Sequence, residues 1–104
     1  MYLRDFLEDL GPNTESNGAR KVFIGLAGGL AGVEIDDGFG PDEIIILRPR
    51  GQPVRVSDFW ALYRTHRRDM RRCAILIAAA GEQPPVSFEI TMSELGVVLL
   101  PKTR

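Results

Sequence analysis

The sequence contains one cysteine and one histidine, and this scarcity excludes several kinds of protein. Among the 104 residues, Cys73 and His66 are the sole representatives of their types. A lone cysteine cannot form an internal disulfide and leaves nothing for a multi-cysteine metal site. The absence of a disulfide fits a reducing compartment, where disulfides are rare.

Long apolar segments are also missing. The longest uninterrupted run, CAILIAAA at residues 73–80, is far shorter than the roughly 20 residues that a membrane-spanning helix needs. The first residues, MYLRDFLEDLG, carry acids where a secretory signal peptide has a basic start followed by an apolar stretch. We therefore expect a cytoplasmic protein that does not insert into a membrane.

The residue patterns of common catalytic and cofactor sites are absent too. The glycine-rich stretch GLAGGLAG, residues 25–32, opens no helix and precedes no Gly-Lys-Ser/Thr, so it predicts a tight hairpin rather than a phosphate-binding loop. No serine lies in a Gly-x-Ser-x-Gly motif. His66 falls on the apolar face of its predicted helix with Phe59 and Tyr63, which favours a core histidine. These patterns favour a non-enzymatic protein with no catalytic residue and no cofactor.

What is present is typical of one α+β domain that spans residues 1–104. Hydrophobic residues make up 44% and charged residues 26% of the chain, which suits a single globular core. Leucine and phenylalanine at helical spacing predict a helix at 2–10, followed by a loop at 13–20. Runs of alternating or β-branched residues predict strands, at 21–27, 31–36, 43–48, 53–56 (a short edge strand), 86–92 and 97–100.

The longest predicted element is a helix from Asp58 to Ala80. Ser57 is a good N-cap, nothing inside the segment breaks a helix, and Gly81 with two prolines beyond it supplies the stop. The alternative is a break near Met70, with residues 71–80 forming a strand, because this run is apolar on all sides.

The element order α-β-β-β-α-β-β predicts an antiparallel sheet of about five strands with one long helix packed across it. This order resembles the class I chaperones of type III secretion without their last helix, and it also resembles many small toxin-immunity proteins. The resemblance lies in topology and not in a sequence motif, so it assigns no role to any residue.

Charge is unevenly distributed, although the net charge is only -1. Residues 1–47 have a balance of -6, residues 48–72 a balance of +6, and residues 73–104 a balance of -1. This segregation indicates either that the two regions pair internally or that the protein presents two faces of opposite sign to partners.

The basic region includes YRTHRRDMRR, residues 63–72. On a helix its five arginines share one face about two and a half turns long, with Asp69 as the one acid near them. Like charges four residues apart destabilise a helix slightly, which favours an anionic partner for this face. The candidate partner-binding residues are these arginines and a neighbouring aromatic anchor: Arg64, Arg67, Arg68, Arg71, Arg72 and Trp60.

The acidic region gathers carboxylates at residues 34–43. Their oxygens would suit a hard cation such as Mg²⁺ or Ca²⁺, but their spacing is not that of an EF-hand loop. A solvated turn is the simpler interpretation, so we predict no metal site. The only candidates for metal ligands are Asp36, Asp37, Asp42 and Glu43.

Three functional hypotheses follow. The first is a small non-enzymatic protein-interaction module (an inhibitor, immunity, chaperone-like or regulatory accessory protein) that binds an acidic protein surface through the arginine-rich helix face. The second is a nucleic-acid-binding protein that uses the same face, against which the low isoelectric point of about 5.8 counts. The third is a metal-dependent enzyme that uses the acidic loop at 34–43. The sequence also leaves formation of a homodimer open.

Overall fold

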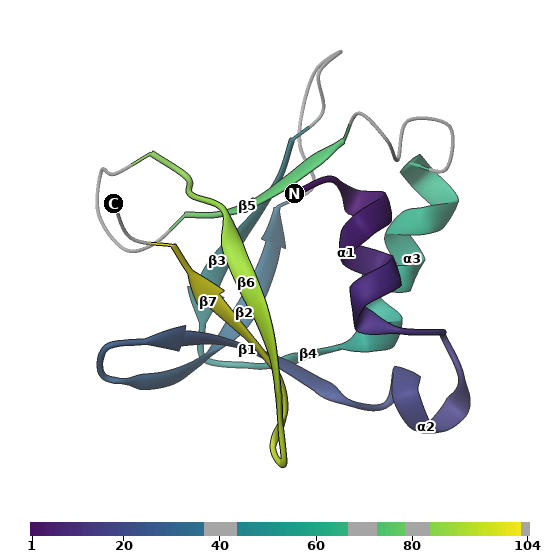
Figure 1. The fold of residues 1–104 in the computed structure, drawn as a ribbon, viewed down its shortest axis with the longest axis horizontal. Helices are drawn as coiled ribbons and strands as arrows, with labels where there is room; N and C mark the ends of the chain where they lie inside the picture. The colour runs from purple at the N-terminus through teal and green to yellow at the C-terminus, as the bar shows by residue number, and fades with distance from the viewer. Residues whose placement is uncertain (37–43, 67–72, 79–83, 103–104) are drawn as a thin grey trace.

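The fold is a curled, mixed β-sheet whose concave face packs against helices (Figure 1). The computed structural model describes residues 1–36, 44–66, 73–78 and 84–102. The elements in chain order are α1 (Leu3–Leu10), α2 (Glu15–Gly18), β1 (Lys21–Leu26), β2 (Gly29–Asp36), β3 (Ile44–Arg50), β4 (Val54–Arg55), α3 (Val56–His66), β5 (Ala74–Ile77), β6 (Phe88–Ser93) and β7 (Gly96–Pro101). The α+β class predicted from the sequence is confirmed.

The strands are ordered β5-β3-β2-β1-β7-β6, and β4 pairs separately with β1. The pairs β3–β5 and β1–β7 are parallel, whereas the other pairs are antiparallel. The expected all-antiparallel sheet is therefore wrong at two places. Parallel neighbours require a crossover connection, and α3 lies in the connection between β3 and β5.

The predicted helix from 58 to 80 is also wrong, and the alternative of a strand in its second half is confirmed. Within the described residues α3 ends at His66, and Ala74–Ile77 forms β5, which pairs in parallel with β3. Ile75 and Ile77 are fully buried on the concave side of this strand. Packing against β3 and the core thus outweighs the helix propensity of the alanines and leucine nearby.

The starts of two helices, α3 and α2, were not predicted as the structure has them. Helix α3 begins one residue before Ser57, the predicted N-cap, and the Asp58 carboxylate accepts a hydrogen bond from the Arg55 N–H at 2.7 Å. The predicted loop at 13–20 contains the short helix α2, whose Thr14 hydroxyl accepts from the Asn17 N–H at 3.2 Å. Both are short polar side chains that satisfy N–H groups at a helix start.

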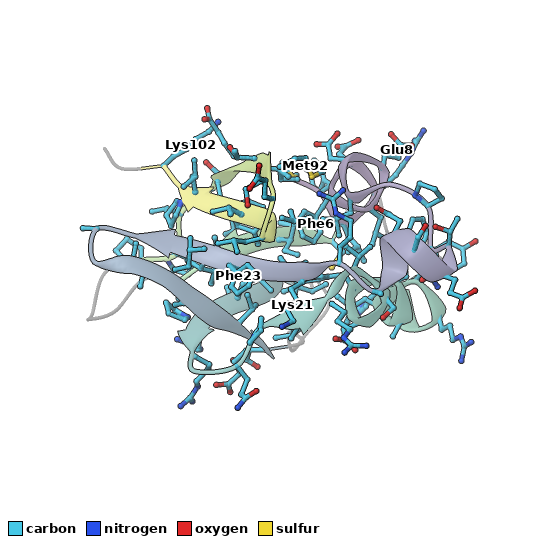
Figure 2. All side chains as sticks on the ribbon, turned by 90° about the horizontal axis from the view of Figure 1, so that it is seen from below. Phe6, Glu8, Lys21, Phe23, Met92 and Lys102 are labelled. Atoms are coloured by element: carbon cyan, nitrogen blue, oxygen red, sulfur yellow. The ribbon has the colours of Figure 1, made fainter. Side chains whose placement is uncertain are left out.

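Three phenylalanines join the helices to the sheet. The Phe6 ring of α1 meets Phe59 of α3 edge to face, with ring centroids 4.9 Å apart, and meets Phe88 of β6 in the same way at 5.5 Å. Figure 2 shows Phe6 among the packed side chains between α1 and the sheet. Around this junction lies the core, built from α1, α3 and the inward faces of the strands: Leu3, Leu7, Leu10, Val22, Ile24, Val33, Ile45, Leu47, Val56, Leu62, Cys73, Ile75, Ile77, Val97 and Leu99.

The two outer strands of the sheet, β5 and β6, approach each other along a seam that is only partly closed. At one end Val86 exchanges two hydrogen bonds with Ile77, at 2.8 and 2.9 Å. Beyond this point the start of the chain lies along β5, because the Ile75 N–H donates to the Met1 carbonyl and the Leu3 N–H donates to the Cys73 carbonyl, both at 2.8 Å. The free edge of β5 is therefore covered, whereas the corresponding edge of β6 faces α1.

No helix among the described residues is long and apolar enough to cross a membrane.

The turn between β6 and β7 depends on a glycine, and this gives a stability test. Gly96 has a φ of +140°, and a Cβ at this position would clash with the Lys21 carbonyl oxygen of β1. We expect Gly96→Ala to lower the free energy of unfolding by about 3 kcal/mol or more, measured by urea denaturation followed by circular dichroism. The control is Gly28→Ala, which places a Cβ in open space and should change stability by less than about 0.5 kcal/mol. Equal effects of the two substitutions would contradict the packing of Gly96 on β1.

Candidate functional site

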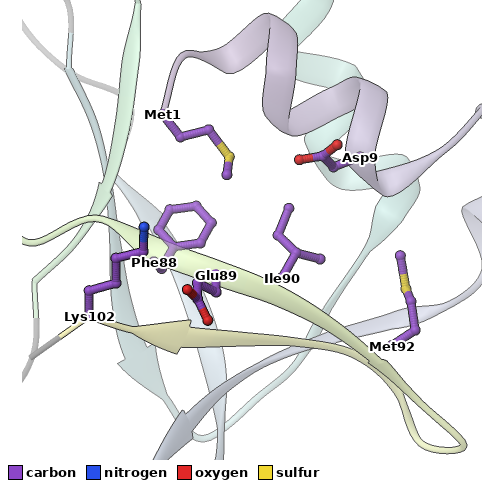
Figure 3. A pocket seen from close by; sticks show the side chains of 7 residues that line it. All are labelled: Met1, Asp9, Phe88, Glu89, Ile90, Met92 and Lys102. Atoms are coloured by element: carbon purple, nitrogen blue, oxygen red, sulfur yellow. The ribbon is translucent and has the colours of Figure 1, made fainter.

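An open groove of about 540 Å³ lies where the seam of the sheet is not closed (Figure 3). One wall comes from the start and the last turn of α1, through Met1 and Asp9. The other comes from β6 and the end of the chain after β7, and the lining residues on that side are Phe88, Glu89, Ile90, Met92 and Lys102. Figure 2 shows Met92 between Lys102 and Glu8 on one side of the molecule.

The alternation of hydrogen bonds along β6 decides which backbone groups face this groove. The Lys102 N–H donates to the Ser87 carbonyl at 2.8 Å, whereas the neighbouring Val86 bonds in the opposite direction, to β5. Since direction alternates residue by residue in an antiparallel pair, Glu89 and Thr91 bond to β7. The N–H and C=O groups of Phe88, Ile90 and Met92 therefore point away from β7, toward the groove.

The outward backbone groups of β6 have no partner in the described part of the chain. The hydrogen bonds that join separate described segments end at Val86 on this edge, and none reaches Ile90 or Met92. No further strand of the described segments follows β6 in the order of the sheet. An unpaired row of strand N–H and C=O groups is a template on which another extended segment can pair.

The side chains of the same residues give the groove an apolar floor that becomes more exposed along the strand. Phe88 is 2% exposed and held by Phe6, Ile90 is partly buried, and Met92 is 47% exposed. The alternation of the sequence predicts all three side chains inward, which is correct for Phe88, partly so for Ile90 and wrong for the exposed Met92. Apolar surface and free backbone groups are thus combined on one strand.

Among the residues that the structure describes, the charged side chains at the rim are two acids and one base, namely Asp9, Glu89 and Lys102. None of them takes part in the ion pairs found among the described residues. Asp9 lies in the last turn of α1, where the helix carries no basic residue. The helix dipole disfavours a carboxylate at this end of a helix. A cation placed close to Asp9 would therefore interact favourably with both the carboxylate and the helix end.

Comparison of the chain with protein families, with curated proteins and with solved structures finds no match. The site is therefore described by its own geometry.

The arginine-rich face predicted from the sequence lies mostly outside the described residues. Arg64 is exposed near the end of α3. The other four predicted contacts, Arg67, Arg68, Arg71 and Arg72, fall in 67–72, of which the structure gives no description. Their role in binding a partner stays a prediction.

Trp60, the predicted aromatic anchor, has a structural contact. Its indole N–H donates to the Gly11 carbonyl at 2.9 Å, and its ring packs on the core. The Asn17 amide donates to the carbonyls of Leu10 and Pro12 nearby, at 3.1 and 2.7 Å. These bonds satisfy carbonyls that the end of α1 leaves free and fix α3 against the α1–α2 connection.

The buried face of α3 is rotated relative to the prediction. Phe59, Leu62 and His66 point into the core, with His66 only 3% exposed, so the prediction of a buried histidine is confirmed. Tyr63 was predicted on the same face, but it is 44% exposed. The spacing of the buried residues still fits a helix, and Leu62 takes the place in the core that the prediction gave to Tyr63.

The described part of the acidic segment pairs with the start of the basic region. Glu34 bonds to Arg50, and the Asp36 carboxylate lies 3.7 Å from Arg48, each pair lying diagonally across β2 and β3. Internal pairing of the two charged regions is thus confirmed for these residues. The remaining metal candidates, Asp37, Asp42 and Glu43, lie outside the described residues, and the described ones include no cluster of three or more metal-ligating side chains.

The groove was not predicted from the sequence. Its signal was present as the alternation of Phe88, Ile90 and Met92 in the predicted strand 86–92. That pattern identifies one face of a strand. It does not show which strand is at the edge of the sheet, because this depends on the pairing of β7 with β1, far away in the sequence.

The orientation of β6 can be tested by hydrogen exchange. We expect the backbone amides of Ile90 and Met92 to exchange at least about tenfold faster than those of Glu89 and Thr91, because only the latter bond to β7. Exchange followed by NMR at each amide measures this ratio. Equal protection of all four amides would show that the outer edge of β6 is paired.

The contact of Trp60 can be tested by conservative substitution. Trp60→Phe keeps an aromatic ring but leaves the Gly11 carbonyl without its donor, so we expect unfolding to cost about 1 kcal/mol less. The measurement is urea denaturation followed by circular dichroism, since the substitution removes the one tryptophan. Tyr63→Phe, which removes an exposed hydroxyl on the same helix, should leave stability unchanged. A similar loss in both variants would contradict a specific role for the indole N–H.

Proposed function

We propose that this protein is a non-enzymatic protein-interaction module that binds an extended segment of a partner protein by adding it as a further strand to β6. The observation that carries the proposal is the unpaired edge of β6 beside an apolar groove walled by α1. In binding of this kind, main-chain hydrogen bonds supply affinity and pockets for alternate side chains supply specificity.

The edge of β6 lacks two residues with which natural proteins often protect free edges. Its sequence, FEITMS, contains no proline and no lysine, which commonly block pairing with another chain. The β5 edge, by contrast, is covered by the first residues of the chain and by Val86. This difference supports β6 as an edge used for binding.

The lining of the groove agrees with an extended segment as the occupant. Its residues follow the strand, from Phe88 past Ile90 to Met92, so alternate side chains of a bound strand would lie beside them in sequence (Figure 3).

The proposal keeps the functional class predicted from the sequence and adds a second surface. Binding of an acidic protein through the arginine-rich helix face is supported at one described position, the exposed Arg64. We prefer the β6 edge to the arginine-rich helix face as the binding surface, because the contacts, burial and unpaired backbone groups of β6 all belong to described residues.

Selection of peptides from a random twelve-residue phage library tests this function. We expect enrichment of peptides with apolar residues at alternate positions, and we expect a bound synthetic copy to protect the amides of Ile90 and Met92. Met92→Pro removes one outward N–H but no bond to β7, so it should weaken peptide binding at least about tenfold.

Two control variants complete the test. Met92→Leu keeps the N–H and an apolar side chain and should bind normally. Leu100→Thr changes a side chain of similar exposure, 40% against 47%, on the opposite face of the sheet without adding charge and should also bind normally. A selection that yields no binders, or peptides that bind the Met92→Pro variant undiminished, would refute strand addition at β6.

A further inference from the structure

We propose that the segment bound at β6 is cationic as well as apolar, with small apolar side chains at alternate positions and lysine or arginine between them. This inference rests on the proposed function and names the chemistry of the partner. The charge distribution around the groove and the alternation of β6 carry it.

The apolar half of the pattern follows from strand geometry. Residues two apart on an added strand lie about 6.6 Å from each other and point to the same face. The same spacing separates Phe88, Ile90 and Met92 on β6, whose side chains form the floor of the groove. Apolar residues at positions i, i+2 and i+4 of the segment would therefore stack beside them, as cross-strand neighbours do.

The cationic residues of the segment are inferred from the acidic side chains that border the groove on β6 and α1. Glu89 is exposed on the other face of β6, where a residue of an added strand would lie directly opposite it. An opposite charge at such a position stabilises the pairing, and a like charge destabilises it. Intervening positions of the segment that carry lysine or arginine would meet this requirement.

The wall of the groove formed by α1 carries negative charge, as Glu89 does. Asp9 lines the groove, the exposed Glu8 precedes it, and the last turn of α1 has no basic residue. Glu8 is already paired with Arg4 at 3.4 Å, whereas no ion pair among the described residues involves Asp9. The carbonyl end of the helix adds partial negative charge at this place. The intervening cationic side chains point to the face of Glu89, so Asp9 adds negative potential on the groove side of the segment rather than a direct contact with them.

Among the described residues, Lys102 is the one base of the lining, beside two acids. It lies opposite Ser87 and diagonally across the β6–β7 pair from Glu89, but no ion pair between described residues joins the two, and it lies next to Phe88 rather than Met92 (Figure 3). The acids beside the centre of β6 are thus Glu89, on the strand itself, and Asp9, on α1. A segment centred on Ile90 would meet negative charge on both of its faces.

Three labelled peptides of equal length test the inference: acetyl-TVKVKVT-amide, the same peptide with glutamate for lysine, and the same peptide with threonine for lysine. We expect fluorescence anisotropy at 50 mM salt to show the lysine peptide binding about fivefold more tightly than the threonine peptide, and the glutamate peptide more weakly than both. At 500 mM salt the lysine and glutamate peptides should approach the threonine peptide, since exposed charges are then screened.

The double variant Asp9→Asn/Glu89→Gln should bind all three peptides alike, with unchanged affinity for the threonine peptide. The matched control is Asp5→Asn/Glu15→Gln, which removes two exposed carboxylates outside the groove and should keep the preference for lysine. If the control loses the preference as well, general attraction to an acidic protein explains it and the inference is overturned.

The outcomes separate this inference from the proposed function. Equal binding of the lysine and glutamate peptides by the unmodified protein overturns the cationic preference, while loss of that binding in Met92→Pro still supports strand addition. Failure of all three peptides to bind, together with an empty phage selection, overturns both. Tighter binding of the glutamate peptide would direct attention to Lys102 and refute the assignment.

Discussion

The edge-to-face contacts of Phe6 with Phe59 and Phe88 hold together the parts of the molecule on which the groove depends. They join α1, α3 and β6, three elements from the beginning, middle and end of the chain. Aromatic pairs of this geometry add about 0.5 to 1.5 kcal/mol beyond the burial of their surface. Because Phe88 is also the buried end of the groove floor, the same contact sets the distance between α1 and the free edge of β6.

The partly closed seam explains why one strand retains an unpaired edge in so small a protein. A sheet closed into a barrel has no edges, and within the described residues the bonds between Val86 and Ile77 are the one place where β5 and the segment before β6 close this sheet. The first residues of the chain then take the place of a neighbour for β5. Helix α1, which follows directly, prevents further closure and leaves β6 facing a groove instead of a strand.

The parts of the fold that rest on short-range patterns could be predicted. Helix α1, the hairpin of β1 and β2 at the glycine-rich stretch, and the hairpin of β6 and β7 all appear where the sequence places them. The alternating sequence that contains Phe88, Ile90 and Met92 also forms a strand, β6, as predicted.

The parts decided by contacts between distant residues could not be predicted. Residues 74–77 have helix-favouring neighbours and become a strand because β3 offers a partner. The sequence around Trp60 predicts an aromatic side chain available for a partner. In the structure its indole N–H is bound to the carbonyl of Gly11, which is distant in the chain. The candidate groove depends on β6 being last in the sheet, and this property belongs to the strand order as a whole.

The parallel pairing of β1 with β7 has a consequence for synthesis of the protein on the ribosome. Val22 pairs with Val97 and Ile24 with Leu99, so the middle of the sheet joins the first strand of the chain to its last. Pairing of such distant residues is entropically costly and slow to form. The nascent chain therefore cannot complete its core until β7 has left the ribosomal tunnel, and before that moment the edge of β1 that pairs with β7 is open and a holding chaperone would be expected to cover it.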